Sequence, residues 1–242
     1  MIFVDSHVHL YEFSDSEIRS ILRNNKIILV SVAENLDTSL KNIKMSLIYE
    51  NVIPAVGIHP WKAEEIKKED LEAFKNLFKK ENIKIIGEVG LDKKFCPNTI
   101  DKQKEIFEFF LKYAKEYNLS VNLHSVGAWR EVFDYLIKYD IKKAYFHWYT
   151  GPEDLLNEIF SVDYFVGINI ACLIQEKQKK VLEKSNINNI LTESDGPYNY
   201  RSLILHPNKL KELYEYIANL KNFEINKLCE KIKNNLSRYI FV

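Results

Sequence analysis

The sequence predicts one α/β domain over residues 1–242, folded as a (β/α)8 TIM-type barrel. Apolar, β-branched runs alternate with segments of helical periodicity along the whole chain, which indicates a parallel sheet. There are eight such runs, and each is continuously apolar, as expected for strands that are covered on both faces. Eight repeats in 242 residues fit a closed barrel better than an open sheet. No Gly/Ser-rich linker, low-complexity tract or change in composition indicates a second domain.

The predicted strands and helices follow in strict alternation. The strands cover residues 2–8, 26–32, 51–58, 83–90, 119–125, 143–149, 163–169 and 188–195. The clearest helix between them covers residues 99–119, where Thr99 or Asp101 is placed to cap the first turn. One face of this helix carries Ile106, Phe109, Phe110 and Tyr113. A final helix over residues 223–241 is predicted to pack on the core through Ile225, Leu228, Ile232 and Leu236.

Composition and charge restrict the class of protein. Hydrophobic residues make up 46% of the chain and charged residues 28%, which is typical of a globular protein. Lysine plus arginine and aspartate plus glutamate both number 34, so no broad basic field indicates tight binding to long nucleic acid. A small or transient nucleic-acid substrate stays possible. The three cysteines are odd in number and far apart, which favours a reducing compartment without disulfides. With no targeting segment and no apolar run of about 18 residues, we expect a cytoplasmic protein that does not enter a membrane.

Histidine and carboxylate side chains stand at the carboxyl ends of the predicted strands. Five of the six histidines and two carboxylates occupy these positions: His7, His9, His59, Glu88, His124, His147 and Asp195. A single histidine after an apolar run is more often a hydrogen-bonded structural residue. Seven such residues together are different, because the carboxyl ends of barrel strands converge on one mouth, where barrel active sites lie. His206 lies outside this pattern and is expected to be a surface or capping residue at the start of a helix.

The residue types at the strand ends indicate a metal site. His7 and His9 are two residues apart on one strand, so their side chains point to the same side and can bind one ion together. Imidazoles mixed with carboxylates suit Zn, Mn or Fe, whereas Mg prefers more oxygen ligands. Two ions use the set best, with His7, His9 and Asp195 on one, His124 and His147 on the other, and Glu88 between them. Paired metals activate a water for hydrolysis, and Asp195 is then placed to accept the proton of that water.

The motifs that contain these residues resemble a known family. "DSHVHL", "VGIHPW", "IIGEVGLD", "NLHS", "HWYTG" and "LTESDGPY" occur in the order and rough spacing of the TatD-like metal-dependent hydrolases of the amidohydrolase superfamily. The resemblance covers essentially the whole chain. It implies a divalent-metal hydrolase, several relatives being deoxyribonucleases. Position by position, it implies the same metal ligands, His7, His9, Glu88, His124, His147 and Asp195, with Asp195 also the catalytic carboxylate.

The sequence departs from the family pattern where the family carries basic residues. The arginine that usually follows the strand-five histidine by two residues is Val126 here, and Arg130 is the next candidate. The family's "HCFSG" is "HWYTG", and the loop after Asp195 is shorter, with Arg201 and His206 as its obvious cationic candidates. Fewer arginines mean fewer phosphate clamps. The chain is still interpreted as a hydrolase despite these departures, but they weaken the hypothesis that it is a nuclease.

Two further groups of residues have competing interpretations. Trp61, Trp129, Trp148 and Tyr149 follow strand-end motifs. They could stack on a base or ring, or they could simply pack around the barrel mouth. Asp92 and Glu193 lie close to predicted ligands and could orient ligand imidazoles, or they could make ordinary strand-end hydrogen bonds.

Three functions remain open from the sequence. The first is a two-metal hydrolase of phosphoester bonds that acts on a small phosphoester or a short nucleic acid. The second keeps the scaffold and metals but cleaves an ester or amide, as a lactonase or deacylase does. The third is a catalytically silent metal-binding scaffold, against which the complete ligand set argues. No stable protein partner is implied, and we expect a monomer or a weak homo-oligomer.

Overall fold

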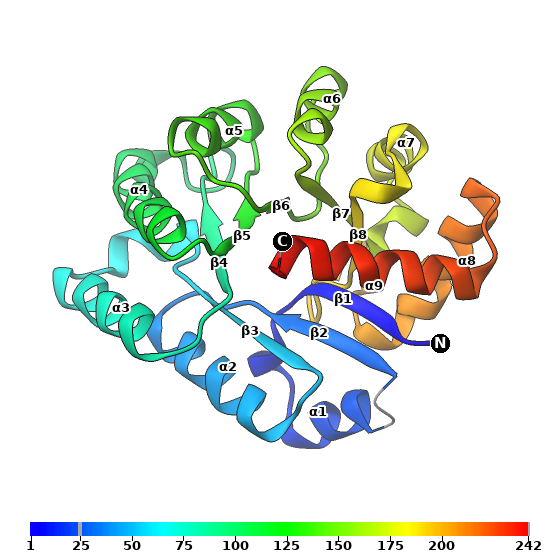
Figure 1. The fold of residues 1–242 in the computed structure, drawn as a ribbon, viewed down its shortest axis with the longest axis horizontal. Helices are drawn as coiled ribbons and strands as arrows, with labels where there is room; N and C mark the ends of the chain where they lie inside the picture. Colours follow the sequence, from blue (N-terminus) through cyan, green and yellow to red (C-terminus); the bar gives the residue numbers. More distant parts are fainter. Residues whose placement is uncertain (24–25, 242) are drawn as a thin grey trace.

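A computed structural model describes residues 1–23 and 26–241, and in it eight parallel strands form a nearly closed barrel inside a ring of helices (Figure 1). The barrel strands are β1 (Phe3–Val8), β2 (Ile27–Ser31), β3 (Val52–Val56), β4 (Ile85–Gly90), β5 (Ser120–His124), β6 (Ala144–Phe146), β7 (Phe165–Asn169) and β8 (Ile190–Glu193). The helices are α1 (Asp15–Leu22), α2 (Leu36–Ile48), α3 (Lys68–Lys80), α4 (Ile100–Glu116), α5 (Trp129–Lys138), α6 (Glu153–Ser161), α7 (Glu176–Lys184), α8 (Leu210–Lys221) and α9 (Ile225–Phe241). The predicted (β/α)8 barrel is therefore confirmed.

The strands pair in chain order, each parallel to the next, from β1 to β8. Side chains join the seam between β8 and β1: the Thr192 hydroxyl donates to the Val4 carbonyl at 2.7 Å. Tyr214 of α8 lies beside both residues, with its hydroxyl 3.0 Å from the Val4 amide and 3.0 Å from the Thr192 hydroxyl. Just beyond the seam, the Asp195 amide donates to the His7 carbonyl at 2.9 Å. The first and last strands are thus fixed side by side at their carboxyl ends.

All eight strands are shorter than predicted, and β6 and β8 end before the polar residues that were expected to close them. β6 ends at Phe146 and β8 ends at Glu193, because Trp148 and Asp195 have φ values of 39° and 56° and leave the extended conformation. His147 and Asp195 therefore stand in the loops directly after these strands, rather than at their last positions.

The helix predicted over residues 99–119 is α4, and its first turn differs from the expectation. Thr99 occupies the N-cap position, but its side chain does not accept a backbone hydrogen bond from the helix. The Thr99 hydroxyl donates instead to the Cys96 carbonyl at 3.1 Å and accepts from the Gln103 amide at 2.8 Å. On the predicted apolar face, Ile106 and Phe110 are buried, whereas Phe109 and Tyr113 are half-buried.

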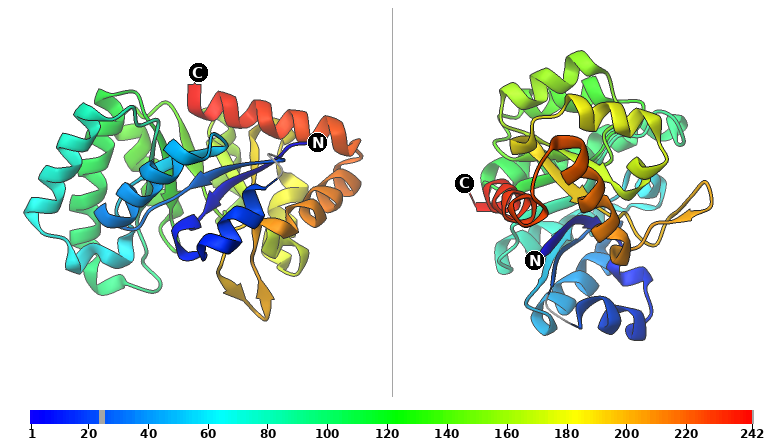
Figure 2. Two further views of the ribbon diagram at one scale, coloured as in Figure 1. Left: turned by 90° about the horizontal axis from the view of Figure 1, so that it is seen from below. Right: turned by 90° about the vertical axis from the view of Figure 1, so that its right-hand side faces the viewer.

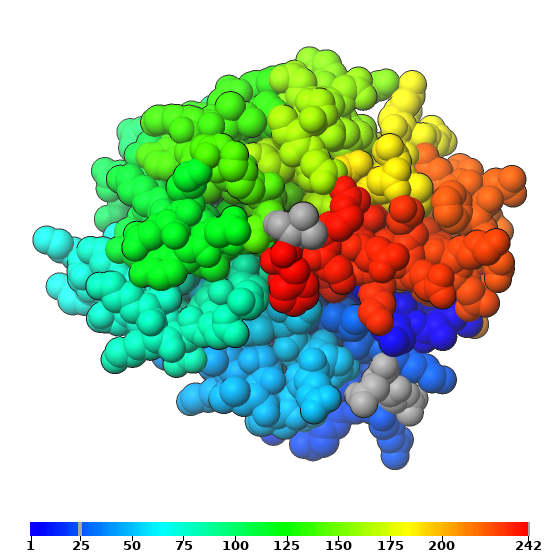
Figure 3. Space-filling model, in the orientation of Figure 1, coloured from blue at the N-terminus to red at the C-terminus, as the bar shows by residue number. Residues whose placement is uncertain are grey.

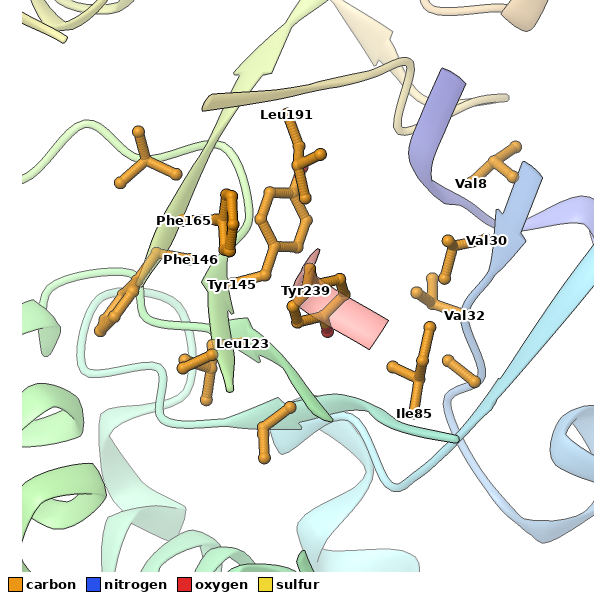
Figure 4. Packing of buried hydrophobic residues seen from close by; sticks show 14 of the residues in the cluster. Val8, Val30, Val32, Ile85, Leu123, Tyr145, Phe146, Phe165, Leu191 and Tyr239 are labelled. Carbon is orange, nitrogen blue, oxygen red and sulfur yellow. The ribbon is translucent and has the colours of Figure 1, made fainter. Parts of the chain in front are cut away.

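Helix α9 closes the amino end of the barrel. It crosses this end in Figure 1 and covers the middle of the same face in the space-filling view (Figure 3). Near its carboxyl end, Tyr239 inserts its ring among Tyr145, Phe165 and Leu191 (Figure 4). Leu228, Ile232 and Leu236 are buried as predicted, and Ile225 is half-buried. The barrel interior is thus a packed core.

A short hairpin projects from the mouth of the barrel, on the side away from α9 (Figure 2). It consists of β9 (Asn199–Tyr200) and β10 (Leu203–Ile204). Its two turn residues, Arg201 and Ser202, have φ values of 48° and 69°, as a two-residue turn of type I′ requires. The hairpin carries Arg201 and Tyr200 above the strand ends.

All three cysteines are free, with Cys96 half-buried and Cys172 and Cys229 buried, which agrees with the absence of a disulfide framework. Among the described residues, the helices are too short or too polar to cross a bilayer.

Candidate metal centre

The six predicted metal ligands meet at the carboxyl end of the barrel, at the bottom of a cavity of about 440 Å³. Five of them, His9, Glu88, His124, His147 and Asp195, line this cavity, and His7 lies fully buried beneath it. They come from five different strand ends, so only the closed barrel brings them together.

Glu88, on β4, occupies the middle of the group, between histidines that follow β1 and those that follow β5 and β6. Its Oε2 atom lies 3.2 Å from His7 Nε2 and 3.7 Å from His9 Nε2. Its Oε1 atom lies 2.8 Å from His124 Nδ1 and 3.2 Å from His147 Nε2. Burial by itself would raise the pKa of Glu88, but the surrounding imidazoles outweigh burial and hold this pKa well below its usual value. The two oxygens of one carboxylate are thus divided between two pairs of histidines.

Asp195 completes the first pair. Its Oδ1 atom lies 3.5 Å from His7 Nε2 and 3.4 Å from His9 Nε2. The left-handed backbone of Asp195, held by its hydrogen bond to the His7 carbonyl, turns the side chain into the mouth. Burial would raise the pKa of Asp195, but the hydrogen bond from His9 and the nearby imidazoles lower it overall.

The protonation of His7 follows from its neighbour Asn122. The Asn122 amide nitrogen donates to the Ser6 carbonyl at 3.0 Å, so the Asn122 oxygen must be the atom that faces His7 Nδ1 at 2.9 Å. His7 Nδ1 is therefore the donor, and the lone pair of Nε2 points toward Glu88 and Asp195. This Nε2 atom is buried and has no hydrogen-bond partner among the described residues.

His124 is held by Asp92. His124 Nε2 lies 3.0 Å from Asp92 Oδ2, which also accepts a 2.7 Å hydrogen bond from the Trp61 indole. The other oxygen of Asp92 accepts from the backbone amides of Lys94 and Phe95. With its proton on Nε2, His124 directs the lone pair of Nδ1 at the centre of the site.

His147 is backed by Glu193, a buried carboxylate at the end of β8. Glu193 Oε1 lies 3.5 Å from His147 Nδ1 and accepts hydrogen bonds from the Trp148 amide at 2.9 Å and the Asn169 side chain at 3.1 Å. Its other oxygen accepts from the Tyr145 hydroxyl. His147 Nε2 is thereby left to face Glu88.

His59 stands beside this group with a different protonation. Its Nδ1 atom accepts the Trp61 backbone amide at 3.2 Å, so a neutral His59 carries its proton on Nε2. That N–H lies 3.4 Å from Glu88 Oε1 and 3.1 Å from His124 Nδ1. Burial lowers the pKa of His59 to about 4, which keeps the ring neutral. His59 is therefore suited to donate a hydrogen bond rather than to bind a cation.

The donor set fits divalent metal ions. When both rings are neutral, the lone pairs of His7 Nε2 and His124 Nδ1 point at carboxylate oxygens, an arrangement that is repulsive unless positive charge lies between them. His7, His9 and Asp195 each offer a ligand atom within 4.8 Å of the other two, so they could hold one ion together. Neutral imidazoles with a second hydrogen-bonded nitrogen, combined with carboxylates, are the usual ligands of Zn and related metals.

The predicted substrate residues are placed unevenly. The cavity is lined by Trp61, Trp129, Trp148 and Arg201. Tyr149 is instead buried, and its hydroxyl donates to the Pro152 carbonyl at 2.6 Å. Contrary to expectation, Arg130 turns away from the mouth, because on the first turn of α5 it pairs with Glu158 at 2.8 Å. His206 also lies outside the cavity, where it caps a short 3-10 helix (Pro207–Lys209) by accepting the Asn208 amide at 3.0 Å.

Several residues of the site were not singled out from the sequence. They are Glu12, Glu34, Lys94, Phe95, Asn122, Gln175, Tyr198 and Tyr200. Asn122 could have been found, because it precedes His124 by two residues on one strand and so points to the same side. The others stand in the segments that follow the strands, whose conformation the sequence pattern does not specify.

Replacing Asp92 with Asn is expected to weaken metal binding about 10- to 100-fold, as is usual when the partner of a ligand imidazole is lost. An asparagine oxygen that accepts from the Lys94 and Phe95 amides would place its NH2 group against the N–H groups of His124 and Trp61. Calorimetric titration of metal-stripped protein with Zn or Mn measures the change, with Asp101→Asn, on the exposed side of α4, as the control. Equal affinities for wild type and Asp92→Asn would show that Asp92 does not orient His124.

Comparison with known proteins gives a consistent result. A family model described as "TatD related DNase" matches residues 4–240. A protein of Haemophilus influenzae named an uncharacterized metal-dependent hydrolase is 30% identical over 99% of both chains. The human deoxyribonuclease TATDN3 is 26% identical and covers 96% of this chain and 92% of its own. Among solved structures, the TatD homologue YJJV of Escherichia coli K12 superimposes with a TM-score of 0.89 at 20% identity, over 99% of this chain and 98% of its own.

Proposed function

This chain belongs to the TatD-related DNase family of metal-dependent hydrolases, and on that premise we propose that it uses two divalent ions to hydrolyse phosphoester bonds. The proposed substrates are short nucleic-acid strands or small nucleotide-like esters. The observation that carries the proposal is the division of the two Glu88 oxygens between His7 and His9 on one side and His124 and His147 on the other.

This division supports two ions rather than one. His7, His9 and Asp195 would hold the first ion, His124 and His147 the second, and Glu88 would contribute one oxygen to each. The nitrogen-rich ligand set favours Zn, Mn or Fe over Mg. When bound, such a pair supplies Lewis acidity and lowers the pKa of water, so that a nucleophile is available at neutral pH.

The residues of the chain supply the remaining chemistry. Asp195 lines the cavity and has a lowered pKa, so it enters the reaction ionised and can accept the proton of the attacking water at a carboxylate oxygen. It can then return that proton to the leaving oxygen. His59 keeps a neutral N–H directed at Glu88 and His124, which holds both groups in place.

Two aromatic groups at the mouth favour a substrate that contains nucleobases. Trp61 packs edge-on against Phe95, with ring centroids 6.0 Å apart. Trp148, which also lines the cavity, packs edge-on against Tyr200, with ring centroids 5.3 Å apart. Trp61 is 47% exposed and Phe95 60% exposed, although side chains of this kind are usually covered. Exposed rings beside a hydrolytic centre offer stacking surfaces for bases.

Each aromatic group also carries one cation. Lys94 Nζ lies 4.9 Å from the centre of the Phe95 ring, and the Arg201 guanidinium lies 5.3 Å from that of the Tyr200 ring. Both residues line the cavity and can contact phosphate oxygens next to the scissile bond. Two cations at the mouth match a substrate with few phosphates.

We expect metal-loaded protein to hydrolyse bis-p-nitrophenyl phosphate and to act on p-nitrophenyl esters and lactones at least about tenfold more slowly. The comparison of kcat/KM is made on metal-stripped protein supplied with Mn, Zn or Mg. Because the mouth offers few cations, kcat/KM for short oligonucleotides should fall only shallowly between low and physiological salt. Turnover of esters or lactones alone would favour an ester or amide hydrolase, and metal binding without any turnover would favour a silent scaffold.

A further inference from the structure

A second cavity, of about 410 Å³, lies between α6 and α7, which are neighbours in the outer ring (Figure 1). We call it the α6–α7 groove and define it by Trp129, Thr150, Pro152, Leu156, Lys177 and Lys180. Trp129 and Thr150 also line the cavity of the metal centre, so the two cavities share a wall. Both helices follow strands that end at the mouth, and their amino ends therefore lie nearest the metal centre.

The α7 side of the groove is positively charged. Lys177, Lys180 and Lys184 line it at positions i, i+3 and i+7, which places them on one face of the helix over about 10 Å. Lys184 pairs with Glu153 of α6 at 3.2 Å. Within residues 1–23 and 26–241, Lys177 and Lys180 form no ion pair, so both ammonium groups are available to an anion. The amino end of α7 adds partial positive charge beside Lys177.

The floor of the groove is apolar and begins at Trp129. Gly151 allows this ring to lie against the loop after β6, because a Cβ atom at Gly151 would stand only 2.7 Å from Trp129 Cγ. Leu156 and Val181 are buried and continue the apolar surface between the helices. A ring and apolar side chains beside lysines can receive bases and phosphates together, and a single strand presents unstacked bases whereas a duplex keeps its bases stacked.

We propose that the α6–α7 groove binds the part of a single-stranded polynucleotide that extends beyond the scissile phosphate. Lys177 and Lys180 contact backbone phosphates, and Trp129 stacks on a base between the two cavities. The inference rests on the proposed phosphoester hydrolysis and adds to it that the substrate is a strand of several nucleotides. Small phosphoesters reach the metal centre without using the groove.

The test compares the double variant K177A/K180A with K112A/K233A, which removes two exposed lysines that line neither cavity. Affinity is measured by fluorescence anisotropy on metal-loaded protein with a labelled, phosphorothioate-linked single strand of about 12 nucleotides. We expect K177A/K180A to bind about tenfold more weakly than wild type at low salt. The slope of log affinity against log salt should fall by about 1–1.5, since each phosphate contact on a single strand contributes about 0.7. The control variant should behave as wild type.

Hydrolysis of bis-p-nitrophenyl phosphate by the same proteins separates this inference from the proposed function. Unchanged turnover of the small ester together with weaker strand binding supports the groove. If wild type does not bind the strand, or if K177A/K180A binds it as K112A/K233A does, the groove inference is wrong. Lysine-dependent strand binding without turnover of any phosphoester would keep the groove and remove the proposed function.

Discussion

Replacing Asp195 with Asn is expected to lower kcat by about a hundredfold or more while the fold stays intact. The substitution keeps the size and the hydrogen-bonding oxygen of the side chain but removes the carboxylate that we propose as the acceptor of the proton of the attacking water. It also removes one negative charge from the pair of His7 and His9, whose Nε2 atoms lie 3.5 and 3.4 Å from Asp195 Oδ1. The measurement is steady-state turnover of bis-p-nitrophenyl phosphate at saturating metal, with circular dichroism as the check on folding.

Two controls make this result specific. Asp101→Asn removes an exposed carboxylate from α4 and should leave turnover unchanged. Metal content measured on Asp195→Asn separates a lost proton acceptor from a lost ligand, because a variant that retains its ions but turns over slowly has lost only the chemistry. Near-normal turnover by Asp195→Asn would remove this residue from the mechanism.

The second large effect is expected at Glu88. Reconstituted wild type should contain up to two divalent ions per chain, and Glu88→Gln fewer than one. In wild type each of the two Glu88 oxygens faces one group of imidazoles, whereas a glutamine amide has only one oxygen to offer. Loss of the ions should lower kcat by about 100- to 1,000-fold, since metal stabilisation of the transition state is worth several kcal/mol.

Metal binding at Glu88 should also be visible in thermal stability. Each ion at about 100 times its Kd stabilises the folded state by about 2.7 kcal/mol, which corresponds to a rise in Tm of about 5–10 °C per ion for a chain of this size. The rise should be present in wild type and in the exposed control Glu50→Gln, and absent from Glu88→Gln. A full metal-dependent rise in Glu88→Gln, or less than one ion per reconstituted wild-type chain, would contradict the two-metal site.

Much of the fold could be predicted because the sequence repeats one local pattern eight times. The strand ends were predictable for the same reason, and Glu88 and His124 stand at the carboxyl ends of buried strands as expected. The predicted ends of strands were wrong where single residues such as Trp148 adopt positive φ, because the hydrophobic pattern does not indicate that conformation.

Loop residues were the hardest to place. Arg130 has the charge expected of a phosphate clamp, but the first turn of α5 directs it to Glu158 on α6, a residue 28 positions further along the chain. Gln175 and Tyr200, which hydrogen-bond to each other at 2.9 Å in the mouth, carry no signal in sequence because each is an ordinary polar residue in its own loop. Their proximity depends on where the barrel places the loops after β7 and β8.

The seam between β8 and β1 has a consequence for the order of events during synthesis. Thr192 bonds to Val4 across 188 residues of chain, and Asp195 meets His7 directly beyond it. At about 5–20 residues per second, the ribosome needs about 10–40 s to make the segment that separates these partners. During that time the amino-terminal histidines exist without the carboxylate that completes their group. The hydrolytic centre is thus a late product of translation, and a nascent chain that stalls before its eighth strand has made both histidines but lacks the carboxylate that completes their group.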